Sequence, residues 1–319
     1  MGSANGLVCS EEKQPLLSFG VISDVQYADI PDGHSFLGVP RYYRHSVCVL
    51  QKAVEEWNQE KPKFVINCGD IVDGFCPKEQ SMITVKKMVN EFDKFNGPVY
   101  HLIGNHCLYN LPREKLLPLL RVPSPDYHAY FEFSPIPEYR FVILDGYDIS
   151  GIGWAKDHPN TLEALKILQE KNPNSDKNNP DGLVGCERRF LMFNGGVGKE
   201  QLKWLDNVLE EATNLNQNVI VCCHLPLDPA ASSFAALLWN YDEVMAVIHG
   251  YNCVKVCLAG HDHKGGHSVD SHGVHHRILE AALECPPGTY AFGRINVFHD
   301  RFSLLGTGRM RSTEMVFGR

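Results

Sequence analysis

The sequence has no excess of positive charge and no long hydrophobic run. Its 30 Lys and Arg residues are outnumbered by 38 Asp and Glu residues, which gives a formal net charge of −8. Nucleic acid and anionic lipid are bound by clustered positive charge, so we expect no polymeric nucleic-acid partner. No run reaches the roughly 18 apolar residues of a membrane span, and residues 1–14 lack the apolar core of a signal peptide. We therefore expect no membrane attachment.

The sequence also lacks an even number of cysteines and any Asn-x-Ser/Thr glycosylation site. Its 11 cysteines are spread over 319 residues. Disulfide scaffolds are typically short and have an even cysteine count, so free thiols are the better interpretation here. Four cysteines stand in apolar runs and are predicted to be buried: Cys68, Cys222, Cys223 and Cys257. We expect a cytoplasmic protein, and we expect it to be a monomer.

Short apolar runs alternate with helical patterns along most of the chain, which is typical of an α/β domain. With 44% hydrophobic residues the chain can bury a sizeable core, and we predict a single domain over residues 1–319. The predicted strands cover residues 16–22, 64–68, 99–103, 219–223 and 254–259. Helices are predicted at 47–57, 78–95 and 202–212, and β-hairpins from runs at 275–279, 290–297 and 302–305.

Residues 148–194 interrupt this alternation. Leu162, Leu165 and Leu168 have helical spacing, and a polar loop rich in Asn, Pro, Asp and Lys follows at 172–180. A loop of this length without apolar periodicity is more typical of an insertion than of a separate domain. We predict a helical and loop insertion at the rim of the active site.

Each of the five predicted strands is followed by polar side chains of the kinds that bind metals. In order along the chain they are Asp24, Gln26, Asp70, Asn105, His106, His224, His261 and His263. The carboxyl ends of strands in an open α/β sheet are where ligands bind. Carboxylate, amide oxygen and imidazole are ligands for divalent first-row metals, and no thiolate is present to favour a structural zinc site. The candidate ligands exceed the needs of one ion, so a site with two metal ions about 3.5–4 Å apart is the simpler hypothesis.

The order of these motifs resembles that of the calcineurin-like metallophosphoesterases. The motifs are Asp-x-Gln at 24–26, Gly-Asp-x-x-Asp-Gly at 69–74, Gly-Asn-His at 104–106, His224, and Gly-His-x-His at 260–263. The resemblance implies a four-layer α/β/β/α sandwich that holds two metal ions. Gln26 stands where the usual family member has His. This Gln, together with the sequences at 104–107 and 260–266, makes the chain similar to the manganese-dependent members of the family that act on ADP-ribose and CDP-alcohols.

This resemblance implies a ligand set and a reaction. Asp24, Gln26, Asp70 and His263 would surround one ion, and Asp70, Asn105, His224 and His261 the other, with Asp70 as the bridge. The expected reaction is hydrolysis of the phosphoanhydride bond by a metal-activated hydroxide, giving AMP or CMP plus a phosphorylated partner. His106 would stabilise developing charge or protonate the leaving oxygen.

The neutral carbonyl oxygen of Gln26 is a harder and weaker ligand than imidazole. We therefore expect two divalent ions with Mn²⁺ preferred, while Mg²⁺, Fe or Zn²⁺ could occupy a prepared sample. Two other functions remain open from the residues alone. One is a phosphoprotein phosphatase or cyclic-nucleotide phosphodiesterase on the same fold. The other is a non-catalytic nucleotide-binding module, in which Gln26 is the change that removed hydrolysis.

Three residues are candidate contacts for a nucleoside diphosphate-linked substrate. Phe36 could stack on a nucleobase or form a local hydrophobic plug, and Asn110 could hydrogen-bond a phosphate. Leu191 belongs to the run 190–193, which could form the wall of a base pocket or a buried strand.

Two further features have simpler interpretations. Asp73 is predicted to cap the helix that follows it. The histidines at 267, 272, 275 and 276 could bind a third metal, but Ser, Asp and Gly surround them, and we interpret them as a surface hairpin.

Overall fold

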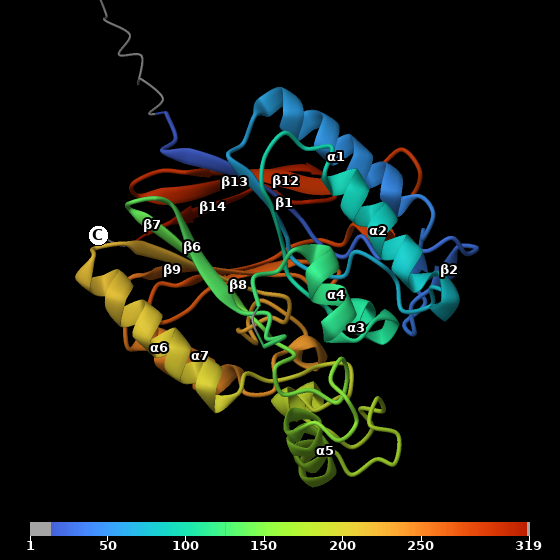
Figure 1. The fold of residues 1–319 in the computed structure, drawn as a ribbon. Helices are drawn as coiled ribbons and strands as arrows, with labels where there is room; N and C mark the ends of the chain where they lie inside the picture. The colour runs from blue at the N-terminus through green and yellow to red at the C-terminus, as the bar shows by residue number, and fades with distance from the viewer. Residues whose placement is uncertain (1–13, 125, 318–319) are drawn as a thin grey trace, which may run out of the picture.

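Two six-stranded sheets face each other in the computed structural model (Figure 1), which describes residues 14–124 and 126–317. The expectation about a signal peptide concerns residues 1–14, nearly all of which lie outside the described residues. Among the described residues, no helix has the length and apolar character needed to cross a bilayer.

The first sheet has the strand order β14-β13-β12-β1-β4-β5. Its strands are β1 (Leu17–Ile22), β4 (Phe64–Asn67), β5 (Val99–His101), β12 (Ala291–Val297), β13 (Arg301–Gly308) and β14 (Thr313–Val316). β1, β4 and β5 run parallel, while β12, β13 and β14 add an antiparallel half beside β1. Three polar segments therefore leave this sheet at one edge.

The second sheet has the order β10-β11-β9-β8-β7-β6. Its strands are β6 (Phe131–Ile136), β7 (Tyr139–Leu144), β8 (Asn218–Cys223), β9 (Val254–Ala259), β10 (Gly266–Val269) and β11 (His275–Ile278). β7, β8, β9 and β11 are parallel. The strands predicted at 219–223 and 254–259 are thus confirmed. The β6–β7 hairpin was not predicted, although Asp145 and Gly146 follow β7 as polar residues follow the other strands of the site.

Aromatic side chains fill the space between the two sheets. The ring of Phe19 stacks on Phe64 at 5.2 Å within the first sheet and meets Phe141 of the second sheet edge-on at 5.1 Å. All three side chains are buried. Because both faces of β1 are covered, its sequence is a nearly continuous apolar run instead of an alternating one.

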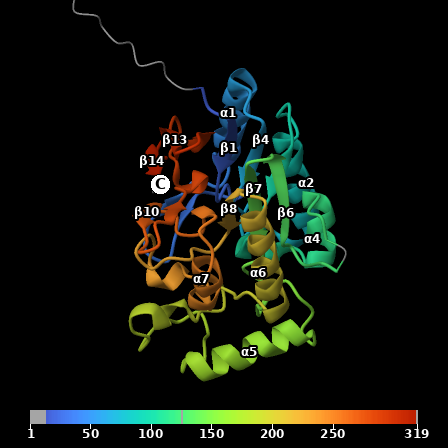
Figure 2. The ribbon, with the colours of Figure 1, turned by 90° about the vertical axis from the view of Figure 1, so that its left-hand side faces the viewer.

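Helices cover the outer face of each sheet (Figures 1 and 2). α1 (Ser46–Glu60) and α2 (Ser81–Phe92) lie against the first sheet, and α6 (Lys199–Asn214) and α7 (Tyr241–His249) against the second. Trp57 of α1 fixes the first layer, since its indole nitrogen donates to the carbonyl of Gly293 in β12 at 3.1 Å. The predicted four-layer α/β/β/α sandwich is confirmed.

The remaining elements lie outside the two sheets and the four covering helices. They are β2 (Gly33–His34), β3 (Pro40–Arg41), α3 (Asn105–Asn110), α4 (Arg113–Leu120) and α5 (Pro159–Lys171), with 3-10 helices η1 (Lys78–Gln80), η2 (Gly185–Arg189), η3 (Phe234–Ala236) and η4 (Ala282–Glu284). α5 contains the predicted helix around 162–168. In both views it lies beyond the ends of the sandwich, below α6 and α7 (Figures 1 and 2).

Two predictions for local structure were wrong. Residues 190–193 do not form a strand but a turn after η2, where the carbonyl of Arg189 already accepts from the amide of Leu191. β10 and β11 do form the predicted hairpin, yet His275 and His276 are buried, not on the surface. They are buried because β11 lies between β10 and β9 inside the sheet.

Candidate metal centre

The predicted ligands gather where the carboxyl ends of both sheets meet. Asp24 and Gln26 follow β1, Asp70 follows β4, and Asn105 begins α3 after β5. His224 follows β8 directly, and His261 and His263 follow β9. Hydrogen bonds donated by backbone amides join these segments: the amide of Gln26 donates to the carbonyl of Asp70 at 2.8 Å, and the amide of His261 donates to the side-chain Oδ2 of Asp24 at 3.0 Å. Residues far apart in the sequence thus form one cluster.

The backbone is strained at four of these positions. Asp24, Gln26, Asp70 and His261 have φ values of 51°, 42°, 53° and 65°. Residues other than Gly adopt positive φ rarely, and such strain concentrates at functional sites where the surrounding structure enforces it. Here the strain turns the side chains off the strand ends and toward one another.

Two motif glycines provide the room for this approach. A Cβ on Gly104 would lie 2.2 Å from Oδ1 of Asp70, and one on Gly69 would lie 2.3 Å from Nδ1 of His224. Gly69 also has a φ of +110°, which side-chain-bearing residues rarely adopt. The glycines of the Gly-Asp and Gly-Asn-His motifs are therefore required by close packing around Asp70 and His224.

Asp24, Gln26 and His263 form one half of the cluster. Nε2 of His263 lies 3.5 Å from Oδ1 of Asp24 and 2.9 Å from Nε2 of Gln26. On the other side of the ring, Nδ1 of His263 lies 2.9 Å from Oε1 of Glu284. Ser23 donates to Oδ2 of Asp24 at 2.5 Å. These contacts leave Nε2 of His263 and Oδ1 of Asp24 facing the same small space.

Asp70, His224, His261 and Asn105 form the other half. Nε2 of His224 lies 3.3 Å from Oδ2 of Asp70, and potential ligand atoms of Asp70, His224 and His261 all lie within 4.8 Å of one another. Nδ1 of His224 is held by the carbonyl of Cys68 at 2.6 Å. An imidazole fixed through one nitrogen presents the other nitrogen to a metal in a defined orientation.

Several buried polar atoms of the cluster have no hydrogen-bond partner among the described residues. They include Oε1 of Gln26, Oδ2 of Asp70 and Nε2 of His224. Burying polar atoms without partners costs free energy, so they are expected to have a ligand that the protein itself does not supply. One amide oxygen, one carboxylate oxygen and one imidazole nitrogen form a donor set that suits divalent cations.

The protonation states agree with a site for cations. Burial disfavours a charged His224, but the neighbouring Asp70 outweighs burial and raises the pKa of His224 to about 8. Burial likewise opposes charge on His263, whereas Asp24 and Glu284 raise its pKa to about 9. Burial also opposes ionisation of Asp24, yet His263 holds the pKa of Asp24 well below its usual range. Without metal, protons on His224 and His263 thus neutralise carboxylate charge that bound metal ions would neutralise.

His106 follows the predicted ligand Asn105 and contacts Asp73. Its Nδ1 atom accepts from the amide of Gly74 at 2.9 Å and lies 3.2 Å from Oδ2 of Asp73. Asp73 does not cap α2, so that prediction was wrong. Its Oδ1 accepts from the amide of Phe75 at 2.8 Å, which holds the turn before η1, and its buried carboxylate is directed toward His106.

The three candidate substrate contacts lie in different environments. Phe36 is 100% exposed between β2 and β3, so it is not a hydrophobic plug. Asn110 donates both amide hydrogens to the carbonyls of Asp73 and His106, and its oxygen accepts from Ser81. It has no N–H left for a phosphate, which contradicts that expectation. Leu191 is buried, and its carbonyl accepts from the indole of Trp239 at 3.2 Å.

Two residues lie beside His261: Phe193, from the run 190–193, and Asn194, which was not predicted. Oδ1 of Asn194 lies 2.8 Å from Nε2 of His261, and the ring of Phe193 lies 5.7 Å from the imidazole. The amide nitrogen of Asn194 also bonds the carbonyls of Arg189 and Ala235. The only local signal for Asn194 is that it precedes Gly195 and Gly196.

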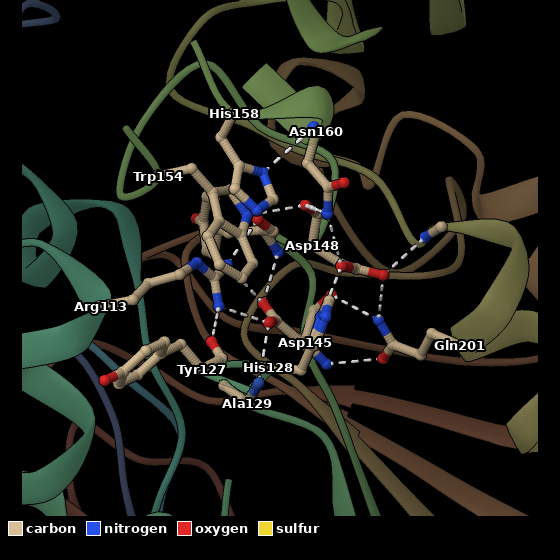
Figure 3. A network of polar contacts seen from close by, with 12 residues as sticks. Arg113, Tyr127, His128, Ala129, Asp145, Asp148, Trp154, His158, Asn160 and Gln201 are labelled. Carbon is tan, nitrogen blue, oxygen red and sulfur yellow. Dashed lines mark hydrogen bonds and ion pairs between the residues drawn. The ribbon is translucent and has the colours of Figure 1, made fainter. Parts of the chain in front are cut away.

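A buried polar network adjoins the cluster at the end of β7 (Figure 3). Arg113 binds both carboxylate oxygens of Asp145, at 2.6 and 3.0 Å, and also donates to the carbonyl of Tyr147. Its guanidinium lies 4.3 Å from the ring centre of Trp154, which places residues of the segment 148–194 against α4. The hydroxyl of Tyr147 donates to Oδ1 of Asn105 at 3.2 Å, so this network reaches a predicted ligand.

The same network holds Asp148 at the start of that segment. The side-chain amide of Gln201 lies 3.2 Å from Oδ2 of Asp148, while His128 and Asn160 both lie 3.1 Å from its Oδ1 (Figure 3). Burial opposes ionisation of Asp148, but the hydrogen bonds from His128 and Gln201 lower its pKa overall. The start of the segment 148–194 is therefore anchored to the sandwich.

An α/β/β/α sandwich with carboxylate, amide and imidazole groups at the strand ends is the architecture of a metallophosphoesterase. The model of the calcineurin-like phosphoesterase family matches residues 17–265. The chain therefore belongs to the calcineurin-like phosphoesterase family, and the resemblance seen in its motifs is confirmed.

Relatives with assigned names cover nearly the whole chain. A protein of Oryza sativa subsp. japonica is 66% identical over 318 residues, 99% of each chain. A protein of Arabidopsis thaliana is 69% identical over 306 residues, 96% of this chain and 98% of its own. A Homo sapiens protein is 41% identical over 320 residues, covering 94% and 93%. All three are named manganese-dependent ADP-ribose/CDP-alcohol diphosphatase.

Solved structures support the same fold. A dimetal phosphatase of Danio rerio is 37% identical and superposes with a TM-score of 0.92, covering 96% of this chain and 100% of its own. A purple acid phosphatase of yellow lupin has a TM-score of 0.52 at 11% identity, over 95% of this chain and 54% of its own, and shows a likeness of fold alone.

Proposed function

We propose that this chain hydrolyses the phosphoanhydride bond of ADP-ribose and of CDP-alcohols with manganese as its working ion. The observation that carries the proposal is the buried cluster of unpartnered oxygen and nitrogen atoms at the carboxyl ends of both sheets. The substrate class rests on the names of relatives that are 66% and 69% identical. The products would be AMP or CMP plus a phosphorylated partner.

Two sets of side chains would hold the metal ions. One ion would be held by Asp24, Gln26 and His263, and the other by Asn105, His224 and His261. Asp70 would be a ligand of both. When bound, two divalent ions draw charge from the phosphoryl oxygens and lower the pKa of water, which supplies the nucleophile. The division is supported by buried atoms without a hydrogen-bond partner in each set, Oε1 of Gln26 in the first and Nε2 of His224 in the second.

His106 would act on the leaving group. It is not among the proposed ligands, and its Nδ1 is held by Gly74 and Asp73, so Nε2 remains to donate toward an oxygen of the substrate. Asp73 would hold the imidazole of His106 in this orientation. Burial opposes ionisation of Asp73, but the contact with His106 lowers its pKa overall, so the carboxylate is charged at neutral pH.

The segment 148–194 would form the rim of the active site, and the protein would act as a cytosolic monomer. Support for the rim comes from Asn194, which bonds both His261 and the carbonyl of Arg189. Support for a reducing compartment comes from the ten cysteines of the described residues, all of which are free. Cys68, Cys222, Cys223 and Cys257 are buried, as predicted.

A substrate panel tests this function. The protein is incubated with ADP-ribose, CDP-choline, a cyclic nucleotide and a phosphopeptide, with and without Mn²⁺, and products are separated by chromatography. We expect AMP from ADP-ribose and CMP from CDP-choline only when Mn²⁺ is present. Turnover of the phosphopeptide alone or the cyclic nucleotide alone would refute the substrate class, and bound but uncleaved nucleotide would indicate a non-catalytic binding module.

A further inference from the structure

A second group of histidines lies apart from the metal centre, at the turn between β10 and β11. The carboxylate of Asp270 and the imidazoles of His249 and His272 place potential ligand atoms within 4.8 Å of one another. His249 is the last residue of α7, while Asp270 and His272 belong to the turn. Figure 2 shows α7 next to the β10 edge of the second sheet. We propose that these three side chains form a binding site for one zinc-type divalent ion.

The turn itself presents the carboxylate of Asp270. Its Oδ1 atom accepts from the backbone amides of His272 at 2.8 Å and Val274 at 3.0 Å. The other oxygen, Oδ2, lies 2.8 Å from Nε2 of His249 and 3.2 Å from Nε2 of His276. One oxygen therefore stabilises the turn, and the other is directed toward the imidazoles.

His276 contacts the carboxylate of Asp270 from the interior of the protein. Its side chain is buried in β11, and its contact with Asp270 holds the carboxylate from the core side. Partners of this kind behind a ligand fix the orientation of its oxygen atoms and increase metal affinity. The direct ligands then come from His249, Asp270 and His272, with water completing the coordination.

The histidines can reach the ion without a change in the fold. The rings of His249 and His272 stack at a centroid distance of 3.7 Å and an angle of 13°, so each ring now faces the plane of the other. A metal binds in the plane of an imidazole, which requires one ring to turn. His272 is exposed on the turn, and a rotation about its side-chain bonds moves no packed residue.

The kinds of ligand atoms in this second site favour zinc over manganese and magnesium. Two imidazoles and one carboxylate with an open position form one of the known ligand sets of catalytic Zn²⁺ sites, whereas Mn²⁺ and Mg²⁺ favour sites richer in oxygen. The site also lies at the other end of the second sheet from His261 and His263. In the parallel pairing of β9 with β11, His275 pairs with Val256 and Ile278 with Ala259, so the β10–β11 turn lies toward the start of β9. Zinc bound there would be separate from the manganese centre.

Metal counting on the manganese-loaded protein tests this proposal. One equivalent of Zn²⁺ is added, loosely held metal is removed by desalting, and Zn and Mn are measured by mass spectrometry. We expect the unsubstituted protein to retain about one Zn per chain with its Mn content unchanged. His272→Ala and His249→Ala should each weaken zinc retention at least about tenfold, while His299→Ala, a change of an exposed histidine elsewhere, should not.

A thermal measurement provides the second readout. Zn²⁺ should raise the unfolding temperature of the manganese-loaded protein and of His299→Ala, and it should fail to do so for His272→Ala. Because His272 is exposed, that variant keeps the fold, and its turnover with Mn²⁺ alone should equal that of the unsubstituted protein. Equal zinc retention in all variants, or zinc gained only as manganese is lost, would overturn the proposal without bearing on the manganese-dependent function.

Discussion

Oε1 of Glu284 lies 2.9 Å from Nδ1 of His263, on the side of the ring opposite the nitrogen that faces Gln26 and Asp24. Glu284 is buried, and its carboxylate also lies 3.6 Å from Arg309. It comes from η4, which follows the second sheet in the chain, so the arrangement joins the C-terminal region to the proposed metal site. A carboxylate behind a metal-binding histidine fixes the tautomer and makes the imidazole a better donor.

Glu284→Gln should therefore weaken manganese binding. We expect a loss of between about 10- and 100-fold in affinity for one of the two ions, because the amide holds His263 less firmly and adds no negative charge. Titration of the metal-free protein with Mn²⁺, followed by electron paramagnetic resonance of the free ion, measures this change. Glu314→Gln, at an exposed residue of β14, is the control. Equal affinity in both variants would show that Glu284 does not position His263.

Tyr147→Phe should weaken the other ion. The hydroxyl of Tyr147 orients the amide of Asn105, and loss of one hydrogen bond costs about 1 kcal/mol, or roughly fivefold in affinity. Tyr139→Phe removes a buried hydroxyl that bonds the carbonyl of Phe298 at the other end of β7. The control variant should lose stability without a change in manganese affinity, as measured by calorimetric titration. A similar loss of affinity in both variants would contradict the assignment.

His106→Gln should reduce kcat by roughly 10²- to 10⁴-fold, because the side chain can no longer donate a proton to the leaving oxygen. The manganese content should stay the same, since His106 is not among the proposed ligands. Product release from CDP-choline and metal analysis of the same sample measure the two quantities. A variant that loses manganese together with activity would place His106 in the metal shell instead.

Gln26→His should change the metal preference. Imidazole is a softer and stronger ligand than an amide oxygen, so the variant should gain activity with Zn²⁺ relative to Mn²⁺. The measurement is the ratio of initial rates with each ion at saturating substrate. Gln51→His, which changes an exposed residue of α1, is the control. Gln201→His would not serve, because Gln201 is buried and contacts Asp148. An unchanged ratio in Gln26→His would refute the role given to Gln26.

Manganese binding should release protons and grow stronger as the pH rises. In the metal-free protein the pKa values of His224 and His263 are about 8 and about 9, so both imidazoles are protonated at pH 7. Each proton must leave before the nitrogen can bind metal, and the affinity should rise roughly tenfold per pH unit for each proton released. Calorimetry in buffers of different ionisation enthalpy counts these protons. Binding at pH 7 without proton release would contradict the ligand assignment.

The same pKa shifts predict the stability of the metal-free protein. Both pKa values lie above the roughly 6.5 of an unfolded histidine, so the stabilisation is complete below about pH 6.5. It should be lost as the pH rises through about 8 and about 9. The unfolding temperature of metal-free protein should fall over this range, and the increase caused by Mn²⁺ should become larger. A metal-free unfolding temperature that rises between pH 6.5 and 9 would contradict this.

Most of the fold and the members of the metal cluster could be predicted because they depend on local patterns. An apolar run followed by a polar residue marks the carboxyl end of a parallel strand, and five such ends were found in the sequence. β6 and β7 were not predicted, although the apolar run at 139–144 is followed by Asp145 as the other strands are followed by polar residues. The burial of His275 and His276 was missed because it depends on β11 lying between two other strands, which no short segment of sequence reveals.

The side chains that stand at the strand ends could be predicted from the sequence, since each motif lies within one short segment. The partners of these side chains are defined only in the folded chain: Glu284 at His263, Tyr147 at Asn105, and Asp73 at His106. The physical reason is that a strand end is encoded by a few consecutive residues. The hydrogen-bond partner of a ligand depends instead on how segments far apart in the chain pack together.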